Sequence, residues 1–159
     1  MGALVLGNFD VAAILAEKKV AVDQKDTDGN TALHNASYEG RADIVKIILG
    51  KYHCLNKQNK RGNTSLMLAL LFDHFYVAAM LANEMIDVDQ ENKDGNIELH
   101  YASEKGRADV VKTIFDKTFD KARCLYKQNT QGNTPLMLAE KYGHNAVADM
   151  IQSFRDRTN

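Results

Sequence analysis

One short phrase occurs four times in this sequence and constrains the fold more than any other feature. The copies read GNTALHNA at 29–36, GNTSLMLA at 62–69, GNIELHYA at 95–102 and GNTPLMLA at 132–139. Their leading glycines are separated by 33, 33 and 37 residues: Gly29, Gly62, Gly95 and Gly132. A fixed period of this length indicates a repeat array, in which each unit is one supersecondary motif that stacks on its neighbours.

A second series of positions keeps the same period, with four extra residues before its last member: Gly7, Gly40, Asp73, Gly106 and Gly143. Together the two series place the four extra residues between Gly106 and Gly132. We assign them to the stretch FDKTFDKARC at 115–124, around Phe119 to Ala122. Because surface loops absorb insertions at little cost, we expect them to lengthen the second helix or the loop of the third unit.

The pattern within each unit predicts a tight turn followed by two helices. Asp28-Gly29 and Asp94-Gly95 are pairs that tolerate the positive φ of hairpin-like turns. A threonine then stands where its hydroxyl can accept amide hydrogens of the first helical turn: Thr31, Thr64 and Thr134. A first helix of about eight residues should end near the second series of glycines. The second helices carry apolar stripes at helical spacing, namely Ile44, Val45, Ile47 and Ile48; Val77, Ala78, Met80 and Leu81; and Val110, Val111, Ile114 and Phe115.

A longer period of two units is also present. Residues 37–49 match 103–115 at 8 of 13 positions, and residues 54–69 match 124–139 at 12 of 16. A block of two units has therefore been copied, and positions where the copies differ are where the surface has been individualised.

The turn-helix-helix unit resembles the ankyrin repeat. The likeness is carried by Gly29-Asn30-Thr31-Ala32-Leu33-His34, Ala36, Gly40 and Asp43-Ile44-Val45, and by their counterparts. It implies an all-α solenoid with β-turn or hairpin tips. We expect a single domain over 1–159, made of a partial N-terminal repeat (1–24), three full repeats (25–57, 58–90 and 91–127) and a C-terminal capping repeat (128–159). The sequence departs from the family pattern at Met67 and Met137, which replace histidine and which we interpret as core fillers.

Composition excludes several classes of function. Twenty basic and 21 acidic residues give a formal net charge of -1, so no overall positive field attracts nucleic acid or an anionic membrane. No apolar run reaches the length of a membrane span, and the N-terminus lacks the layout of a secretory signal. We therefore expect a cytoplasmic protein. Basic residues in two runs, Lys18, Lys19, Lys57, Lys60 and Arg61, are interpreted as a solvated turn surface.

Neither catalysis nor a bound metal or cofactor is expected. His34 and His100 occupy the place where ankyrin-like units use an imidazole to tie a turn, and no residue spacing completes a catalytic triad or an acid/base pair around them. Cys54 and Cys124 lie two units apart, at roughly 20 Å if stacked helices are about 8–10 Å apart. That distance excludes a disulfide or a shared metal. No Gly-rich phosphate loop is present.

The resemblance implies a concave face that binds other proteins. It draws turn tips from Thr27, Asp28 and Asn30; Lys60, Arg61 and Asn63; Lys93, Asp94 and Asn96; and Thr130, Gln131 and Asn133. The first helices would add Tyr38 and Glu39, Leu71 and Phe72, Glu104 and Lys105, and Lys141 and Tyr142. Leu71 and Phe72 stand out, since aromatic anchors beside charges are typical of binding hot spots. The alternative is that LALLFDHFY at 68–76 packs as core, with Phe75 and Tyr76 turned inward.

The predicted function is therefore a non-enzymatic module that binds a protein partner of unknown identity. Two alternatives are a targeting or regulatory segment of a larger protein and a host-directed binding factor of a virus or intracellular bacterium. We expect a monomer. At the C-terminus, Gln152, Arg155, Asp156 and Arg157 should keep the outer face of the last helix wet. Apolar residues at the N-terminus predict that the first helix frays or self-associates.

Overall fold

The computed structural model describes residues 22–51, 56–84, 90–118 and 120–158. These ranges contain helices and turns, and no strand occurs within them. The helices are α2 (Ala32–Tyr38), α3 (Ala42–Lys51), α4 (Ser65–Leu71), α5 (Phe75–Glu84), α6 (Glu98–Glu104), α7 (Ala108–Lys117), α8 (Lys121–Tyr126), α9 (Pro135–Lys141) and α10 (Asn145–Thr158).

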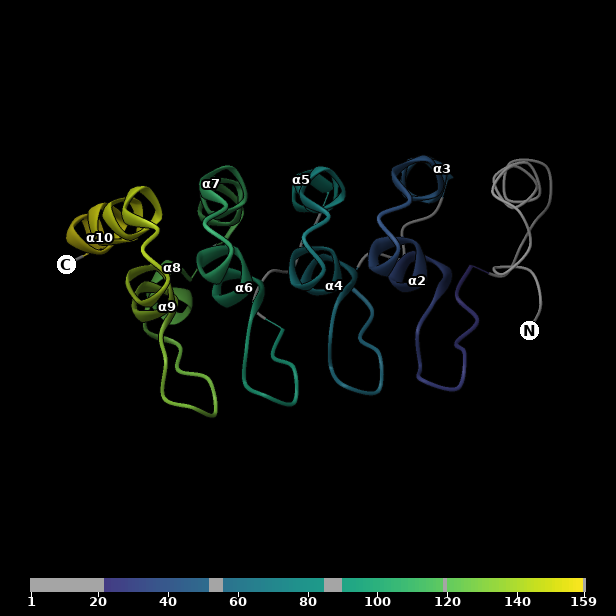
Figure 1. Cartoon of the computed structure of the whole chain (residues 1–159), viewed down its shortest axis with the longest axis horizontal. Coiled ribbons are helices and arrows are strands. Elements are labelled where there is room, and N and C mark those ends of the chain that lie inside the picture. The colour runs from purple at the N-terminus through teal and green to yellow at the C-terminus, as the bar shows by residue number, and fades with distance from the viewer. Residues whose placement is uncertain (1–21, 52–55, 85–89, 119, 159) are drawn as a thin grey trace.

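The helices form two rows that run along the stack (Figure 1). One row holds the first helix of each unit, α2, α4, α6 and α9, and the other holds the second helices, α3, α5, α7 and α10. The loops that precede the first helices all extend from the same edge of the stack (Figure 1). This arrangement confirms the predicted all-α solenoid with its turns on one edge.

Each first helix has seven residues and ends just before the member of the second series in its unit, namely Gly40, Asp73, Gly106 or Gly143. The hydroxyls of Thr64 and Thr134 accept the amide hydrogens of Met67 and Met137, as expected for N-caps. At Thr31 the hydroxyl lies 2.8 Å from His34 Nδ1. The Thr31 amide donates to the same Nδ1 at 3.2 Å, so the imidazole binds back to the residue that precedes the helix.

The apolar stripes of the second helices form the continuous core. Ile44, Val45 and Ile48 of α3 are buried, as are their counterparts Val77, Ala78 and Leu81 of α5 and Val110, Val111, Ile114 and Phe115 of α7. Leu33, Leu66 and Leu99 of the first helices are fully buried against them. Each such side chain contributes roughly 1.5–3 kcal/mol, and does so only while the adjoining unit covers it.

The turn between the two helices of a unit needs a left-handed residue. Gly40, Gly106 and Gly143 have φ values of 69°, 66° and 74°, and Asp73 adopts 62° at the same position. A Cβ on Gly40 would overlap the imidazole of His74, whose Nε2 donates to the Tyr38 carbonyl at 3.0 Å. Glycine is therefore required there for backbone conformation and for space.

The inserted residues do not lengthen the second helix of the third unit. Helix α7 has ten residues, the same length as α3 and α5. The chain instead forms the separate helix α8, which begins after Asp120, whose carboxylate accepts the Arg123 amide hydrogen at 2.9 Å. Cys124 and Leu125 of α8 are buried, so this helix packs into the core. The comparison with Cys54 lies outside the described residues.

The last unit also departs from expectation. Met67 is fully buried, whereas Met137 is 48% exposed and lines a hollow with Tyr126, Gln152 and Arg155. The interpretation of Met137 as a core filler is therefore wrong, because no further unit covers that face of α9 within the described residues. The prediction that the first helix at the N-terminus frays or self-associates concerns residues that lie outside the described ranges.

Candidate functional site

The edge of the stack is built from four turns with one internal design. In the second turn, the Asn59 side-chain oxygen accepts the amide hydrogens of Arg61 and Asn63, both at 3.0 Å. Asn92 and Asn129 bind the third and fourth turns in the same way, and Asp26 binds the first. This Asx geometry fixes the path of each tip.

Neighbouring turns are also bonded to one another. The Lys60 amide donates to the Asp28 carbonyl at 3.0 Å, and the pattern repeats from Lys93 to Arg61 and from Thr130 to Asp94. The side chains form a parallel ladder, in which Asn59 donates to Asn30, Asn92 to Asn63, and Asn129 to Asn96. Asn63 is only 7% exposed, because its side chain is engaged in this ladder. Asn30 and Asn96 are likewise engaged in the ladder.

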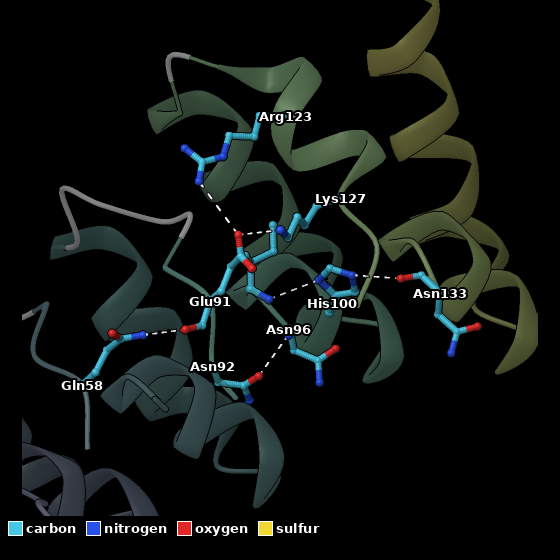
Figure 2. Close-up of polar contacts among 9 residues, drawn as sticks. Gln58, Glu91, Asn92, Asn96, His100, Arg123, Lys127 and Asn133 are labelled. Carbon is cyan, nitrogen blue, oxygen red and sulfur yellow. Dashed lines mark hydrogen bonds and ion pairs between the residues drawn. The ribbon is translucent and has the colours of Figure 1, made fainter. Parts of the chain in front are cut away.

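The two buried histidines, His34 in the first unit and His100 in the third, connect their units to the turn of the following unit. His100 Nδ1 accepts the Ile97 amide hydrogen at 3.2 Å, so the proton is on Nε2, which donates to the Asn133 carbonyl at 3.1 Å (Figure 2). His34 makes the corresponding bond to the Asn63 carbonyl at 3.1 Å. Burial lowers the pKa of both imidazoles below the ordinary 6.5, although the carbonyl bonds oppose that shift. Both rings are thus structural, and neither has a free edge for catalysis.

Polar contacts on the other side of the third turn hold it in place. Gln58 donates to the Glu91 carbonyl at 2.9 Å, and the Glu91 carboxylate pairs with Lys127 at 2.5 Å and with Arg123 at 3.9 Å (Figure 2). Arg123 and Lys127 lie in and just after α8. Helix α8 and the residue that follows it therefore support the turn at Glu91.

A groove of about 510 Å³ lies between the turns and the C-terminal ends of α2 and α4. Its lining consists of Asp28, Asn30, Tyr38, Asn59, Lys60, Arg61, Asn63, Leu68, Leu71, Phe72 and Lys93. Tyr38, Leu71 and Phe72 are 51%, 36% and 41% exposed. The Tyr38 and Phe72 rings meet edge to face, with centroids 4.3 Å apart. Nine of the predicted turn and helix residues therefore line this groove, which is all of its lining except Asn59 and Leu68.

Leu68 lies in the same groove, although sequence reasoning did not select it. It occupies the position of Asn35 in the first unit and of Tyr101 in the third. Comparison of the units at that position was the signal that could have identified it. The inward assignment of Tyr76 is wrong, since this ring is 72% exposed and lies outside the groove lining.

A second hollow of about 220 Å³ continues along the turns of the third and fourth units. Seven more predicted residues line it: Asp94, Asn96, Glu104, Thr130, Gln131, Lys141 and Tyr142. The Lys141 ammonium lies 5.4 Å from the Tyr142 ring centroid. Glu39 and Lys105 line neither hollow. Glu39 is exposed, and Lys105 pairs with Asp73 at 2.8 Å.

Two further features are absent from the described ranges. Within them, no three His, Cys, Asp or Glu side chains cluster in a way that would hold a metal ion. None of the described helices combines the length and the apolar character that a bilayer crossing requires.

The family assignment follows from comparison with known families. The family model described as Ankyrin repeats (3 copies) matches residues 1–59, 51–124 and 87–156. The chain belongs to the ankyrin-repeat family. Ankyrin-repeat domains are typically non-catalytic binding modules and generally act in protein–protein interaction. A comparison with curated proteins found none that matches this sequence.

Proposed function

We propose that this ankyrin-repeat chain is a non-catalytic module that binds a protein partner across the turns and the ends of its first helices. The observation that carries the proposal is the groove, where Tyr38, Leu71 and Phe72 are exposed between charged turns. An apolar centre with aromatic residues and a charged rim is the composition of binding hot spots. The second hollow, with Asp94, Glu104, Lys141 and Tyr142, extends the same face, and Glu39 and Lys105 belong to its rim.

Exposure favours the binding role of Leu71 and Phe72 over a core role. Leu70, the neighbouring residue of α4, is fully buried, whereas the following two side chains are each more than one-third exposed. The equivalent pairs in other units are Tyr38 and Glu39, Glu104 and Lys105, and Lys141 and Tyr142. No core requirement therefore demands apolar residues at these positions.

The test is substitution of both side chains, Leu71→Ala with Phe72→Ala. Proteins captured by the wild-type chain are identified by mass spectrometry, and their affinity for each variant is measured by titration with the purified partner. We expect a loss of about 2 kcal/mol, close to thirtyfold in Kd, because truncated hot-spot anchors lose their buried contacts. The melting temperature should fall by only a few degrees.

Tyr76→Ala is the matched control, since it removes a large exposed ring outside the groove. It should leave affinity unchanged. If the double variant loses stability and keeps its affinity, Leu71 and Phe72 belong to the core and the proposed binding surface is wrong.

A further inference from the structure

We infer that the groove recognises an acidic peptide segment with an aliphatic or aromatic anchor. This inference rests on the proposed function and specifies the chemistry of the partner. The segment would place its apolar side chain against Tyr38, Leu71 and Phe72 and its carboxylates beside Lys60, Arg61 and Lys93.

The groove carries an excess of uncompensated positive charge. Lys60, Arg61 and Lys93 line it together with a single carboxylate, Asp28. All three cations are exposed, and none of them forms an ion pair with another residue in the described ranges. Other lysines of the same stack are paired, among them Lys57 with Asp23 at 2.7 Å and Lys127 with Glu91 at 2.5 Å. The groove cations are therefore available to an anionic ligand.

Hydrogen bonds fix the backbone of the turns that carry these cations. The Lys60 amide is bonded to the Asp28 carbonyl, the Arg61 amide to Asn59 and the Lys93 amide to the Arg61 carbonyl. Only the side chains remain free to adjust. A preorganised backbone lowers the ordering cost of binding, which leaves more of the contact energy for affinity.

The apolar part of the groove lies directly beside this charge. Leu71 and Phe72 follow one another at the end of α4, and the Tyr38 ring at the end of α2 meets Phe72 edge to face. Leu68, which is 6% exposed, also lines this part of the groove. Since bare cations alone attract any polyanion, the apolar anchor gives the groove a preference for a peptide over a nucleic acid. The volume of about 510 Å³ falls in the range of sites that hold a few side chains.

The neighbouring hollow has the opposite charge. Asp94 and Glu104 line it with one cation, Lys141, so an acidic segment is repelled there. The face thus changes sign along the stack, and the acidic part of a partner is directed to the first two units.

The internal repeat supplies a matched substitution for the test. Lys60-Arg61 of the second turn corresponds to Thr130-Gln131 of the fourth, and both turns have the same Asx bonds. The double variant Lys60→Thr with Arg61→Gln therefore removes two charges and introduces the two side chains that the fourth turn already carries at these positions. Lys46→Gln with Lys112→Gln removes two charges from α3 and α7, outside the groove.

The probe is a library of random 16-residue peptides selected on the whole immobilised chain, with counter-selection on the Leu71→Ala, Phe72→Ala variant. We expect the enriched peptides to carry Asp or Glu next to Leu, Ile, Phe or Tyr. Their affinity should fall roughly five- to tenfold in the Lys60→Thr, Arg61→Gln variant, with a weaker dependence on salt, because exposed charge contacts are individually small. The Lys46→Gln, Lys112→Gln control should bind like wild type.

The outcomes separate the inference from the function on which it rests. Groove-dependent peptides with neutral or basic flanks, or acidic peptides unaffected by the charge variant, overturn the inference and leave the proposed function intact. The inference is also overturned if a 20-nucleotide single-stranded DNA binds as tightly as the peptides and its binding is unchanged in the Leu71→Ala, Phe72→Ala variant. If no enriched peptide depends on Leu71 and Phe72, the proposed function fails as well.

Discussion

His34 and His100 show how a single buried imidazole couples one unit to the next. Each ring receives an amide hydrogen on Nδ1 and donates from Nε2 to a carbonyl of the following turn, Asn63 or Asn133. Both rings are 1% exposed, and burial lowers the pKa of each below 6.5. A protonated ring would lose the Nδ1 acceptor and place a charge in the core, so the folded state requires the neutral form.

The first prediction at this scale is a loss of stability below pH 6.5. The unfolded chain protonates these histidines near 6.5 and the folded chain only at lower pH, so unfolding takes up protons in that window. Their contribution is complete above about pH 6.5 and is lost as the pH falls, by up to about 1.4 kcal/mol per pH unit for each histidine. Urea unfolding followed by circular dichroism at pH 7.5, 6.0 and 5.0 measures the slope.

The control introduces the residue that the second and fourth units already use, as His34→Met with His100→Met. This variant should be less stable at pH 7.5, because two inter-unit hydrogen bonds are lost, and its stability should depend less on pH between 6.5 and 5. A slope equal to that of wild type would show that carboxylates, rather than these imidazoles, govern the acid sensitivity.

Sequence reasoning identified these histidines as structural but did not find the asparagine ladder. A residue's role within its own unit is visible as a local pattern, as with His34 beside Thr31. The ladder from Asn59 to Asn30 joins side chains of neighbouring turns, and its sequence signal is the recurrence of Asn59, Asn92 and Asn129 at the repeat period. For the same reason the sequence did not reveal that Asn63, predicted as a tip residue, bonds to Asn92 of the next turn.

Helix α8 shows what an insertion does to an element of a repeat. The four extra residues leave α7 and α9 in their places in the stack, because the chain between these helices forms the short helix α8. Cys124 and Leu125 of α8 pack into the core. The period places the insertion between Gly106 and Gly132, the part of the chain in which α8 lies. It could not predict a separate helix, because KARCLY is too short for a helical pattern to stand out from its surroundings and its stability comes from contacts with α9 and α10.

At this scale we predict that α8 depends on its cap. Asp120→Ala removes the carboxylate that accepts the Arg123 amide hydrogen at 2.9 Å and should destabilise the protein by about 1 kcal/mol. Amides of residues 123–126 should exchange faster with solvent deuterium. Asp116→Ala is the control, since it removes a carboxylate from an exposed pair with Lys112, a contact worth well under 1 kcal/mol. Equal effects of the two substitutions would contradict the assigned cap.

Over the whole molecule, the interfaces between units alternate in chemistry. The first and second units are joined by His34 to Asn63 and by His74 to Tyr38, and the third and fourth by His100 to Asn133 and by His144 to Glu104. The second and third units instead meet through Thr64, whose hydroxyl donates to the buried Glu98 carboxylate at 2.8 Å, and through Lys105 with Asp73. The copied block of two units in the sequence thus corresponds to two imidazole-bonded pairs in the structure.

The last prediction is that Thr64 controls the coupling between these two pairs. Thr64→Val removes both the cap of α4 and the hydrogen bond to a fully buried carboxylate, whereas Thr134→Val at the equivalent position removes only the cap of α9. We expect a loss of about 1 kcal/mol for Thr134→Val and at least about 1 kcal/mol more for Thr64→Val, since leaving a buried polar group without its hydrogen-bond partner costs about 1–3 kcal/mol.

Because stability in a repeat array is a sum of unit and interface contributions, weakening the middle interface should also separate the unfolding of the two halves. Helices α6 to α10 should then keep their deuterium protection at urea concentrations where α2 to α5 have lost theirs, since α10 has 14 residues and Phe154 stacks on the buried Phe115. Simultaneous loss of protection in both halves of the Thr64→Val protein, or equal costs for the two threonine substitutions, would show that the Thr64–Glu98 bond does not hold the pairs together.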